Sequence, residues 1–492
     1  MNQAPAPLRG DRKSVFDSVD RCRSSFSSSS LDKIDLALAL ALAAVAASII
    51  LPGLGRESLA NWDEAIYGVI ARNLLSRPGL TLYYAGQPWF EKPPLVFWLM
   101  AASSSFFGVT EFALRLPAAF FGVSAIALQY FAGRRLSGRL AGVASAIFLL
   151  GIPQFVAYSR LAMLDVPLTV FGMLSFVLLL YGDRRRLPAM LAGISFGLAI
   201  LTKSAAAFLF APGLVAIALA SRGVRFFWSM EMLWAAPLAL VIALPWHIWA
   251  AVSYGPSFLR PYFFFHLMRR FAEPIEGHEG GFFFYFDLYL HNAGWLALVH
   301  AAGIATACVI AIRRRNSRLA ALVTLPVGAF LIVSLQQTKI GWYLTPVYPG
   351  AALAAALALV NVFRNTRTRA IAIFFATLLA VPGIVDGRGP FVDSYNIRVF
   401  SPEVRSLRNT SVFVNRVPLL YTFDVADPAP RFYLADRVES IDQQELERLI
   451  ARREAFLCLT FKPQAGEFLN HHPHANLQIV ASTEYLAVIE YR

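Results

Sequence analysis

Charged residues that could do chemistry stand in a few short segments between the long apolar runs of this 492-residue chain. A carboxylate can act as a general base, and a lysine can stabilise negative charge that develops during a reaction. Charges at a lipid–water boundary are costly unless they are paired or used, so several such segments on one side of a membrane would form one polar site. The candidates are Asp63, Glu64, Glu91, Lys92, Asp165 and Lys203.

The adjacent acids Asp63 and Glu64 lie in residues 61–68, which predict a short helix with both carboxylates at its start. Each charged candidate also has a plainer interpretation, as a solvated interfacial charge or a cap on a helix end. Two aromatic runs, 263–265 and 282–285, are typical of segments that pack against lipid.

The composition predicts a membrane protein. The chain is 57% hydrophobic and 15% charged, and its mean hydropathy is +0.54, whereas soluble proteins carry about 25% charged residues. The net charge of +13 is distributed in short clusters between apolar runs, which excludes the continuous basic surface of a nucleic-acid-binding protein. Cys22, Cys308 and Cys458 are far apart in the sequence and predict neither a disulfide framework nor a metal knuckle.

Apolar runs of near-spanning length alternate with arginine clusters. The positive-inside rule places these clusters in the cytoplasm and the acid-bearing loops on the outer side. The runs cover residues 36–54, 112–133, 140–157, 166–181, 188–202, 204–220, 232–252, 292–312, 319–335, 344–362 and 370–385. The clusters are Arg134, Arg135 and Arg139; Arg184, Arg185 and Arg186; Arg222 and Arg225; Arg313, Arg314, Arg315 and Arg318; and Arg364, Arg367 and Arg369.

Residues 94–107 are also apolar, but a full span there would reverse every later loop. We therefore interpret them as a membrane-surface or partly inserted helix, which gives about eleven crossings, or thirteen if a helical pair is hidden there. We expect a protein of the bacterial inner (plasma) membrane type that crosses the membrane many times. Its N-terminus would be cytoplasmic and its C-terminal domain periplasmic.

The fold class expected is an all-α polytopic membrane protein with a small α/β C-terminal soluble domain. Residues 1–32 have the composition of a disordered cytoplasmic tail. Residues 33–385 form the transmembrane domain, with periplasmic loops 53–111 and 253–291, and residues 386–492 form the α/β domain. Its predicted strands are 412–414, 419–423, 456–461, 477–481 and 485–489; one helix is predicted at 441–453, with a capping box from Ser440 to Gln443.

Several motifs together resemble the GT-C glycosyltransferases, and more narrowly the branch of protein O-mannosyltransferases and 4-amino-4-deoxy-L-arabinose lipid A transferases. The resemblance covers about residues 55–350, and its weight comes from the order and loop placement of the motifs. They are the acid pair at 63–64, Glu-Lys-Pro-Pro-Leu at 91–95, Glu-Phe-Ala-Leu-Arg-Leu-Pro at 111–117, Met-Leu-Asp at 163–165, Thr-Lys at 202–203, His-Leu-Met-Arg-Arg-Phe at 266–271, Gly-His at 277–278, and residues 339–343 with Pro346 and Pro349.

The resemblance implies a polyprenyl (undecaprenyl) phosphate sugar donor and inversion at the anomeric carbon. Acceptors on the periplasmic side would be lipid A or lipopolysaccharide, another envelope glycan, or a protein. The phosphate is a good leaving group, so the site needs cations more than a general acid. The resemblance implies that the donor phosphate is bound by Lys92, Lys203, Arg270 and Lys339. It implies that the catalytic residues are Asp63, as base or acceptor-orienting acid, with Glu64 and Asp165. The substrate pocket would include Tyr67 and Tyr343.

Glu91 and His266 match positions at which a lipid A transferase of this branch can hold a metal. Two ligands are few for zinc, so a structural role is the competing interpretation, and no cofactor is required by the scheme although a zinc or magnesium ion is compatible with it. His471, His472 and His474 fit an exposed loop better than a metal tract.

Two features depart from the narrow branch. The chain and its C-terminal domain are short for the aminoarabinose enzymes, and the long central outer domain of eukaryotic protein mannosyltransferases is missing. The main rival hypothesis is a lipid or solute transporter or flippase, which would place charges and helix breaks at the membrane midplane and often shows repeated halves. A non-catalytic envelope assembly protein is a third hypothesis, and it would tolerate loss of Asp63 and Lys92.

Overall fold

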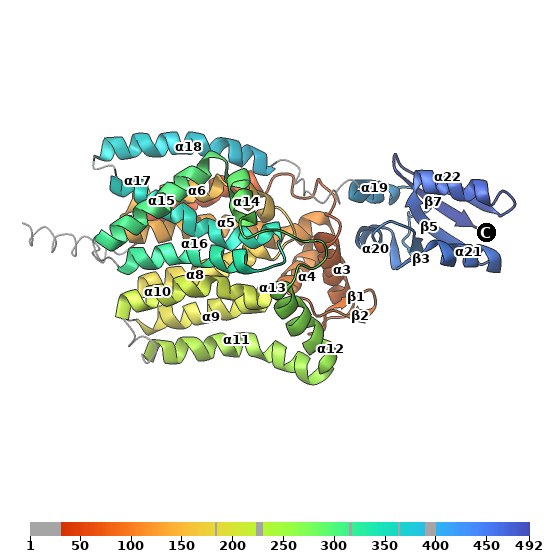
Figure 1. The fold of residues 1–492 in the computed structure, drawn as a ribbon, viewed down its shortest axis with the longest axis horizontal. Helices are drawn as coiled ribbons and strands as arrows, with labels where there is room; N and C mark the ends of the chain where they lie inside the picture. The colour runs from red at the N-terminus through yellow and green to blue at the C-terminus, as the bar shows by residue number, and fades with distance from the viewer. Residues whose placement is uncertain (1–30, 183–184, 223–229, 314–316, 363–364, 389–399) are drawn as a thin grey trace, which may run out of the picture.

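The computed structural model describes residues 31–182, 185–222, 230–313, 317–362, 365–388 and 400–492. A bundle of long helices occupies most of its length, and a small α/β domain sits at one end of the bundle (Figure 1). The predicted tail at 1–32 lies almost wholly outside the described residues, as do Cys22 and Arg184, Arg225, Arg314, Arg315 and Arg364 of the predicted clusters.

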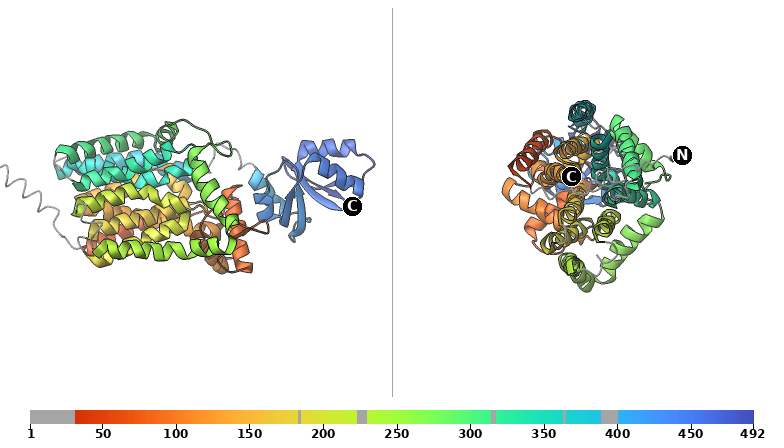
Figure 2. Two further views of the ribbon diagram at one scale, coloured as in Figure 1. Left: turned by 60° about the horizontal axis from the view of Figure 1, so that its bottom comes forward. Right: turned by 90° about the vertical axis from the view of Figure 1, so that its left-hand side faces the viewer.

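The helices of the bundle run along its long axis and are seen end-on in the right-hand view of Figure 2. They are α2 (Lys33–Ile50), α5 (Glu111–Ser137), α6 (Arg139–Leu150), α8 (Asp165–Gly182), α9 (Arg186–Lys203), α10 (Ala211–Arg222), α11 (Met230–Tyr254), α15 (Trp295–Arg313), α16 (Ser317–Leu335), α17 (Tyr348–Val362) and α18 (Thr366–Arg388). The short helix α7 (Pro153–Ser159) follows α6 at a bend of 75°.

Within the described residues, seven helical segments are long and apolar enough to cross a membrane, or eight if the bent pair α6–α7 is one span. The chain is therefore a multi-pass membrane protein. The predicted number of about eleven is higher because sequence runs were counted separately. One 35-residue candidate, Arg186–Ala220, holds both α9 and α10 joined by the 3₁₀ turn η1 (Ser204–Phe210), and the apolar parts of α8 and α16 are just short of the length required.

Close helix packing depends on small residues, as expected where lipid offers no hydrophobic drive for association. A Cβ added at Gly193 would lie 2.1 Å from the carbonyl oxygen of Ala235. One added at Gly303 would lie 2.4 Å from the Cα of Ala355. The backbones of α9 and α11, and of α15 and α17, can approach this closely only because these positions lack a side chain.

A second set of short elements lies at the end of the bundle that faces the α/β domain, here called the site end (Figure 1). It includes α3 and α4, and α4 is a 13-residue apolar helix, about 20 Å long, that is too short for a bilayer core of roughly 30 Å. The elements are α3 (Asp63–Ser76), β1 (Tyr83–Tyr84), β2 (Gln87–Pro88), α4 (Leu95–Phe107), α12 (Pro256–Leu259), the π-helix η3 (Arg260–Arg269) and α13 (Arg270–Ala272). α14 (Phe284–Ala293) and the 3₁₀ turn η4 (Gly341–Val347) lead back into the bundle.

The C-terminal domain contains a five-stranded mixed sheet of order β4-β3-β5-β7-β6. β3 pairs in parallel with β4 and β5, and β7 pairs antiparallel with β5 and β6. The elements are α19 (Phe400–Leu407), β3 (Val417–Thr422), α20 (Pro428–Tyr433), β4 (Ala435–Ser440), α21 (Gln443–Arg452), β5 (Phe456–Phe461), α22 (Lys462–His471), β6 (Leu477–Ser482) and β7 (Leu486–Tyr491). The small α/β domain expected from the sequence is confirmed.

Two local predictions in this domain were wrong. Ser440 ends β4, and the N-cap of α21 is Asp442, whose side chain accepts a hydrogen bond from the N–H of Glu445. Residues 412–414 form a turn and a bend rather than a strand, because the N–H of Phe413 donates to the nearby carbonyl of Thr410 instead of to another strand. Sequence inspection also missed β4 and α22, whose charged or mixed composition lacks the apolar alternation of a typical strand or helix.

Candidate active site

Asp63 is the first residue of α3, and the residue before it has an unusual backbone. Trp62 has φ 65° and ψ −120°, a conformation that L-residues rarely adopt and that costs about 1–3 kcal/mol. The buried Tyr67, one helical turn on, donates its hydroxyl hydrogen bond to Asp63. Burial and the charges of Asp63, Glu91 and Asp165 raise the pKa of Tyr67 well above its usual value. Because all three carboxylates act on Tyr67, they lie close together although they come from three separate segments.

Glu64 is almost completely enclosed and uses both carboxylate oxygens for structure. It accepts bonds from Arg115 Nε at 2.9 Å and Nη2 at 2.8 Å, and from the N–H groups of Ala60 at 2.8 Å and Ala162 at 2.6 Å. Burial opposes ionisation, but Arg115 and these backbone donors outweigh it and keep the pKa of Glu64 below its usual value. Through these four hydrogen bonds Glu64 joins α3, α5 and the loop that leads to Asp165.

Glu91 and Lys92 lie between β2 and α4. Trp89 Nε1 donates to Glu91 Oε1 at 3.2 Å, and His266 Nε2 lies 3.9 Å from Glu91 Oε2. The partly buried position of Glu91 raises the pKa of its carboxyl group, and nearby Lys92 opposes this shift. Within the described part of the chain, Lys92 makes no hydrogen bond or ion pair, so its ammonium is available to a ligand.

Asp165 and Lys203 form a buried ion pair, with Lys203 Nζ 2.6 Å from Asp165 Oδ1. Lys203 ends α9, and the next residue, Ser204, has φ 51°, so the chain turns sharply at this point. The ring centroid of Tyr343 lies 5.2 Å from Lys203 Nζ. The other carboxylate oxygen of Asp165 is buried and has no hydrogen-bond partner within the described residues.

Arg270 reaches the site from α13. Its Nη1 donates to the Tyr343 hydroxyl at 3.5 Å, and its Nη2 lies 2.7 Å from Glu276 Oε2. Its Nε is buried and has no partner among the residues that the structure describes. Burial, together with the charges of Lys92 and Arg270, lowers the pKa of His266 to about 3, so this imidazole stays neutral across the physiological range.

Lys339 is close to these groups, but its ammonium is committed to the backbone. It donates to the carbonyl of Ser334 at 2.7 Å and to that of Gln336, and it lies 5.4 Å from the Tyr285 ring centroid. Since Lys339 satisfies the carbonyls that end α16, its contacts are those of a structural cap.

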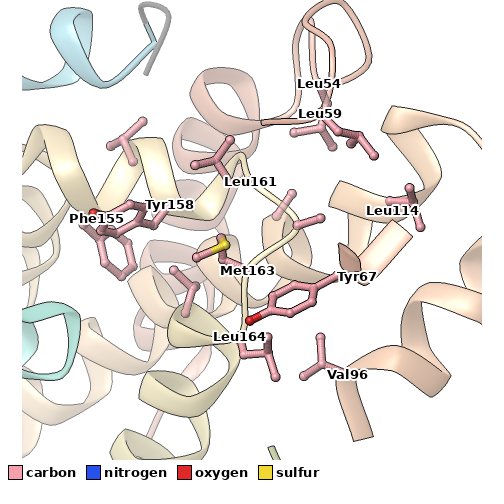
Figure 3. Packing of buried hydrophobic residues seen from close by; sticks show 14 of the residues in the cluster. Leu54, Leu59, Tyr67, Val96, Leu114, Phe155, Tyr158, Leu161, Met163 and Leu164 are labelled. Atoms are coloured by element: carbon pink, nitrogen blue, oxygen red, sulfur yellow. The ribbon is translucent and has the colours of Figure 1, made fainter. Parts of the chain in front are cut away.

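An apolar platform supports the polar groups (Figure 3). Tyr67 lies between Leu164, from the loop before α8, and Val96 of α4. Its ring makes edge-to-face contacts with Phe97 at 5.1 Å and Trp89 at 6.3 Å between centroids. Tyr67 is 2% exposed and is therefore part of this buried platform, whereas Tyr343 is only partly buried.

Comparison with known proteins agrees with this architecture. A crystal structure of ArnT from Cupriavidus metallidurans bound to undecaprenyl phosphate superposes with a TM-score of 0.74 at 18% identity, covering 92% of this chain and 97% of that one. An oligosaccharyltransferase from Archaeoglobus fulgidus gives a TM-score of 0.60 at 15% identity, covering 90% and 71%. This chain has the GT-C fold.

Sequence comparison points to the same group. Residues 91–249 match the family model described as dolichyl-phosphate-mannose-protein mannosyltransferase. An undecaprenyl phosphate-alpha-4-amino-4-deoxy-L-arabinose arabinosyl transferase of Pseudomonas savastanoi pv. phaseolicola is 30% identical over 68% of this chain and 63% of its own length. A protein of the same description from Aeromonas salmonicida is 28% identical over 63% and 57%. The chain thus spans about three fifths of the length of such curated relatives.

Several predicted residues come together at the site end. The charges of Asp63, Glu91 and Asp165 all act on Tyr67, and the charge of Lys92 acts on Asp165. Lys203, Arg270, Tyr343 and His266 are linked to the same group by the contacts above, and Lys339 lies at its edge. Two participants were missed in the sequence: Arg115, whose motif was noted without a role, and Glu276, which carries no local signal.

Glu91 and His266, the pair of possible metal ligands, lie close to each other. Glu91 and the neutral imidazole of His266 could donate two ligands to a divalent cation, and the Nδ1 of His266 is buried without a partner in the described residues. No group of three or more His, Cys, Asp or Glu side chains suited to a metal occurs in the described segments. A structural zinc site has four ligands and a catalytic one has three from the protein, so these residues do not fit either type.

Proposed function

We propose that this protein is an inverting membrane glycosyltransferase that takes a sugar from a polyprenyl-phosphate donor. The observation that carries the proposal is the pairing pattern at the site end. Glu64 and Lys203 are each bound to an opposite charge, whereas Asp63 and Lys92 make no ion pair among the described residues. One carboxylate and one ammonium in the same charged cluster are thus free for a substrate.

Lys92 and Arg270 are suited to the donor phosphate. When the bond from the anomeric carbon to the phosphate oxygen breaks, its electron pair stays on the phosphate, whose charge becomes more negative. Cations held in a water-poor site stabilise that charge more than they stabilise the ground state. The free Nε of Arg270 and the unpaired Lys92 ammonium supply this charge, and the Asp165–Lys203 pair keeps Lys203 in place beside Tyr343.

Asp63 is suited to the acceptor. A hydroxyl acceptor loses its proton to Asp63 as its oxygen attacks the anomeric carbon from the face opposite the phosphate. That geometry inverts the anomeric configuration, which NMR of the product checks. If the acceptor is a phosphate, it is already ionised, and Asp63 orients it or binds a cationic sugar amine. No step requires a metal at Glu91 and His266.

The substrates are proposed from the chemistry and the relatives. The first donor to test is undecaprenyl phosphate carrying 4-amino-4-deoxy-L-arabinose, because that donor is in the names of the sequence relatives. The proposed acceptor is lipid A or lipopolysaccharide, with other envelope glycans and proteins as the alternatives. We place the chain in the bacterial inner membrane, with the site end and the C-terminal domain on the periplasmic side.

The test combines purified protein in nanodiscs with mass spectrometry of envelope lipids and glycoproteins from a deletion strain and its parent. We expect one glycan-bearing species to be lost on deletion and to return with the wild-type gene, but not with Asp63→Asn or Lys92→Ala. Full complementation by both variants would overturn the enzyme assignment. Loss of lipid translocation without any loss of sugar transfer would favour the flippase.

A further inference from the structure

The segment that leads into Asp63 is fastened to the C-terminal domain. The N–H of Leu59 donates to the Tyr433 hydroxyl at 2.9 Å, and the carbonyl of Leu59 accepts a bond from Ser401 Oγ. Asn61 Oδ1 accepts from the N–H of Ala429 at 3.1 Å. The backbone N–H and carbonyl of Leu59 are therefore both bound by α19 and α20, and so is the side chain of Asn61, two residues before Asp63.

The same two helices also contact α5 and the start of the segment. Tyr433 donates onward to Glu111 Oε1 at 2.9 Å, and Arg405 Nε lies 3.0 Å from that oxygen. Arg405 Nη1 donates to the carbonyl of Arg56 at 2.7 Å. Tyr433 and Ser401 are buried, so the hydrogen bonds that these two hydroxyls make are shielded from competing water.

Packing brings α20 directly against α3. A Cβ added at Gly68 would lie 3.0 Å from Phe432 Cδ2, from Leu59 and from Leu114. Arg72, one turn further along α3, donates to the carbonyls of Arg431 and Phe432 at 3.3 and 3.2 Å. α20 thus contacts both α3 and the segment that precedes it.

The strained backbone of Trp62 lies between two sets of fixed contacts. On one side Glu64 is held by Arg115, and on the other Leu59 and Asn61 are held by α19 and α20. A strained conformation persists only where surrounding contacts over-determine it. Without the C-terminal contacts, residues 59–62 could relax, and the start of α3, where Asp63 stands, would move with them.

We propose that the C-terminal domain is a positioning element for Asp63, and that Tyr433 and Ser401 are its positioning residues. Neither residue touches the substrate; they fix the backbone from which Asp63 reaches the acceptor. The inference rests on the proposed function, because it assigns the domain a part in that reaction. Misplacement of a reacting group by about 1 Å can lower a rate 100-fold, so turnover should depend on these bonds more than donor binding does.

The kinetic test compares Tyr433→Phe and Ser401→Ala with Tyr421→Phe, in full-length protein in nanodiscs. Tyr421 lies in β3 of the same domain, and its hydroxyl makes no hydrogen bond among the described residues, so Tyr421→Phe is the matched control. We expect kcat to fall about 10- to 100-fold for Tyr433→Phe, with the KM for the donor unchanged and Tyr421→Phe equal to wild type. Equal kcat for Tyr433→Phe and wild type would overturn the proposal, as would a loss that appears only in KM.

A second readout does not depend on catalysis. Hydrogen–deuterium exchange of residues 57–66 should be faster in Tyr433→Phe than in wild type or Tyr421→Phe, while exchange in α8 and α17 stays the same. Unchanged exchange in 57–66 would show that the contact does not fix the segment. If wild type transfers no sugar but exchange responds as expected, the proposed function fails and the fastening of the segment stands.

Discussion

Asp63 and Glu64 are neighbours in sequence with opposite environments. Glu64 is 1% exposed and bound by four donors, two of them from Arg115. Asp63 is partly exposed, and among the described residues the side chain that donates to it is Tyr67. A carboxylate whose lone pairs are all used cannot also take a proton from an acceptor, so Asp63 is the member of the pair that we propose as the base.

Replacing Asp63 with Asn should remove the base and keep the shape. We expect kcat to fall by about 10²–10⁴-fold, as for loss of a general base, with the KM for the donor nearly unchanged. Steady-state kinetics with a hydroxyl acceptor measures this. The control is Asp287→Asn, an acid in the first turn of α14 for which no contact within the site is found in the described residues. A fall of less than threefold for Asp63→Asn would contradict the role.

The raised pKa of Glu91 predicts a pH effect on donor binding. Lowering the pH through this raised pKa protonates Glu91, removes a negative charge beside Lys92, and leaves the site more positive toward phosphate. The KM for the donor should therefore fall as the pH falls. The Glu91→Gln variant should show a low KM at every pH. Because His266 has its pKa lowered to about 3, it adds no titration to the same range.

The measurement for Glu91 is the KM for a polyprenyl-phosphate sugar from pH 5 to pH 9, since this phosphodiester has no proton to lose there. Free polyprenyl phosphate is avoided because the second ionisation of a phosphate monoester, with a pKa of about 6, would confuse the profile. A donor KM that rises as the pH falls, in wild type but not in Glu91→Gln, would reverse the sign and contradict the prediction.

At the scale of elements, the Glu64–Arg115 pair joins α3, α5 and the loop before α8. Arg115 also donates to the carbonyls of Leu54, Glu57 and Ser58 at 2.8–3.0 Å. The Arg115 guanidinium thus donates to five oxygen atoms, two from the Glu64 carboxylate and three from carbonyls that lie outside any helix or sheet. The segment between α2 and α3 keeps its path because three of its carbonyls are bound to Arg115 of α5.

Removing Arg115 should unfold this junction. The Arg115→Ala change leaves the buried Glu64 carboxylate without its partner, which costs about 3–5 kcal/mol. Thermal unfolding in detergent should show a large fall in Tm. The control is Arg448→Ala, which breaks an exposed pair with Glu445 worth about 0–1 kcal/mol. Equal Tm values for the two variants would contradict the assigned role of Arg115.

At the scale of the whole molecule, the charged site and the C-terminal domain occupy the same end of the bundle (Figure 1). At the N-terminal helix, the buried Asp35 binds Arg134 at 2.7 Å and Arg139 at 2.9 Å. These arginines were predicted as cytoplasmic charges, and in the fold they also anchor α2 to α5 and α6. Arginines that the positive-inside rule predicts to be cytoplasmic therefore also pack helices together.

The proposed orientation can be tested in a cysteine-free background. Arg185→Cys, in an exposed arginine cluster, should react with a membrane-impermeant maleimide only after cell lysis. Asn470→Cys, exposed on α22 of the C-terminal domain, should react in intact spheroplasts. The reverse labelling pattern would place the site end in the cytoplasm and exclude acceptors on the periplasmic side.

The sequence predicted the helical bundle, the small α/β domain, and the segments that carry the site. Hydropathy and charge are local properties of the sequence. Apolar runs of spanning length, and Asp63, Lys92 and Asp165 between them, can therefore be recognised without knowing which distant residues they contact. Local capping was harder: the N-cap of α21 was placed at Ser440 instead of Asp442 because both residues suit the position.

Only the tertiary structure decided which of these charges are free. Glu64 is bound by an arginine 51 residues away, Lys203 by an aspartate 38 residues away, and Leu59 by a tyrosine 374 residues away. Such partners are chosen by the packing of helices, and no short window of sequence contains both members. The residue types on the loops could be seen in the sequence, whereas the division into bound and available groups arises when distant segments satisfy one another in the buried interior.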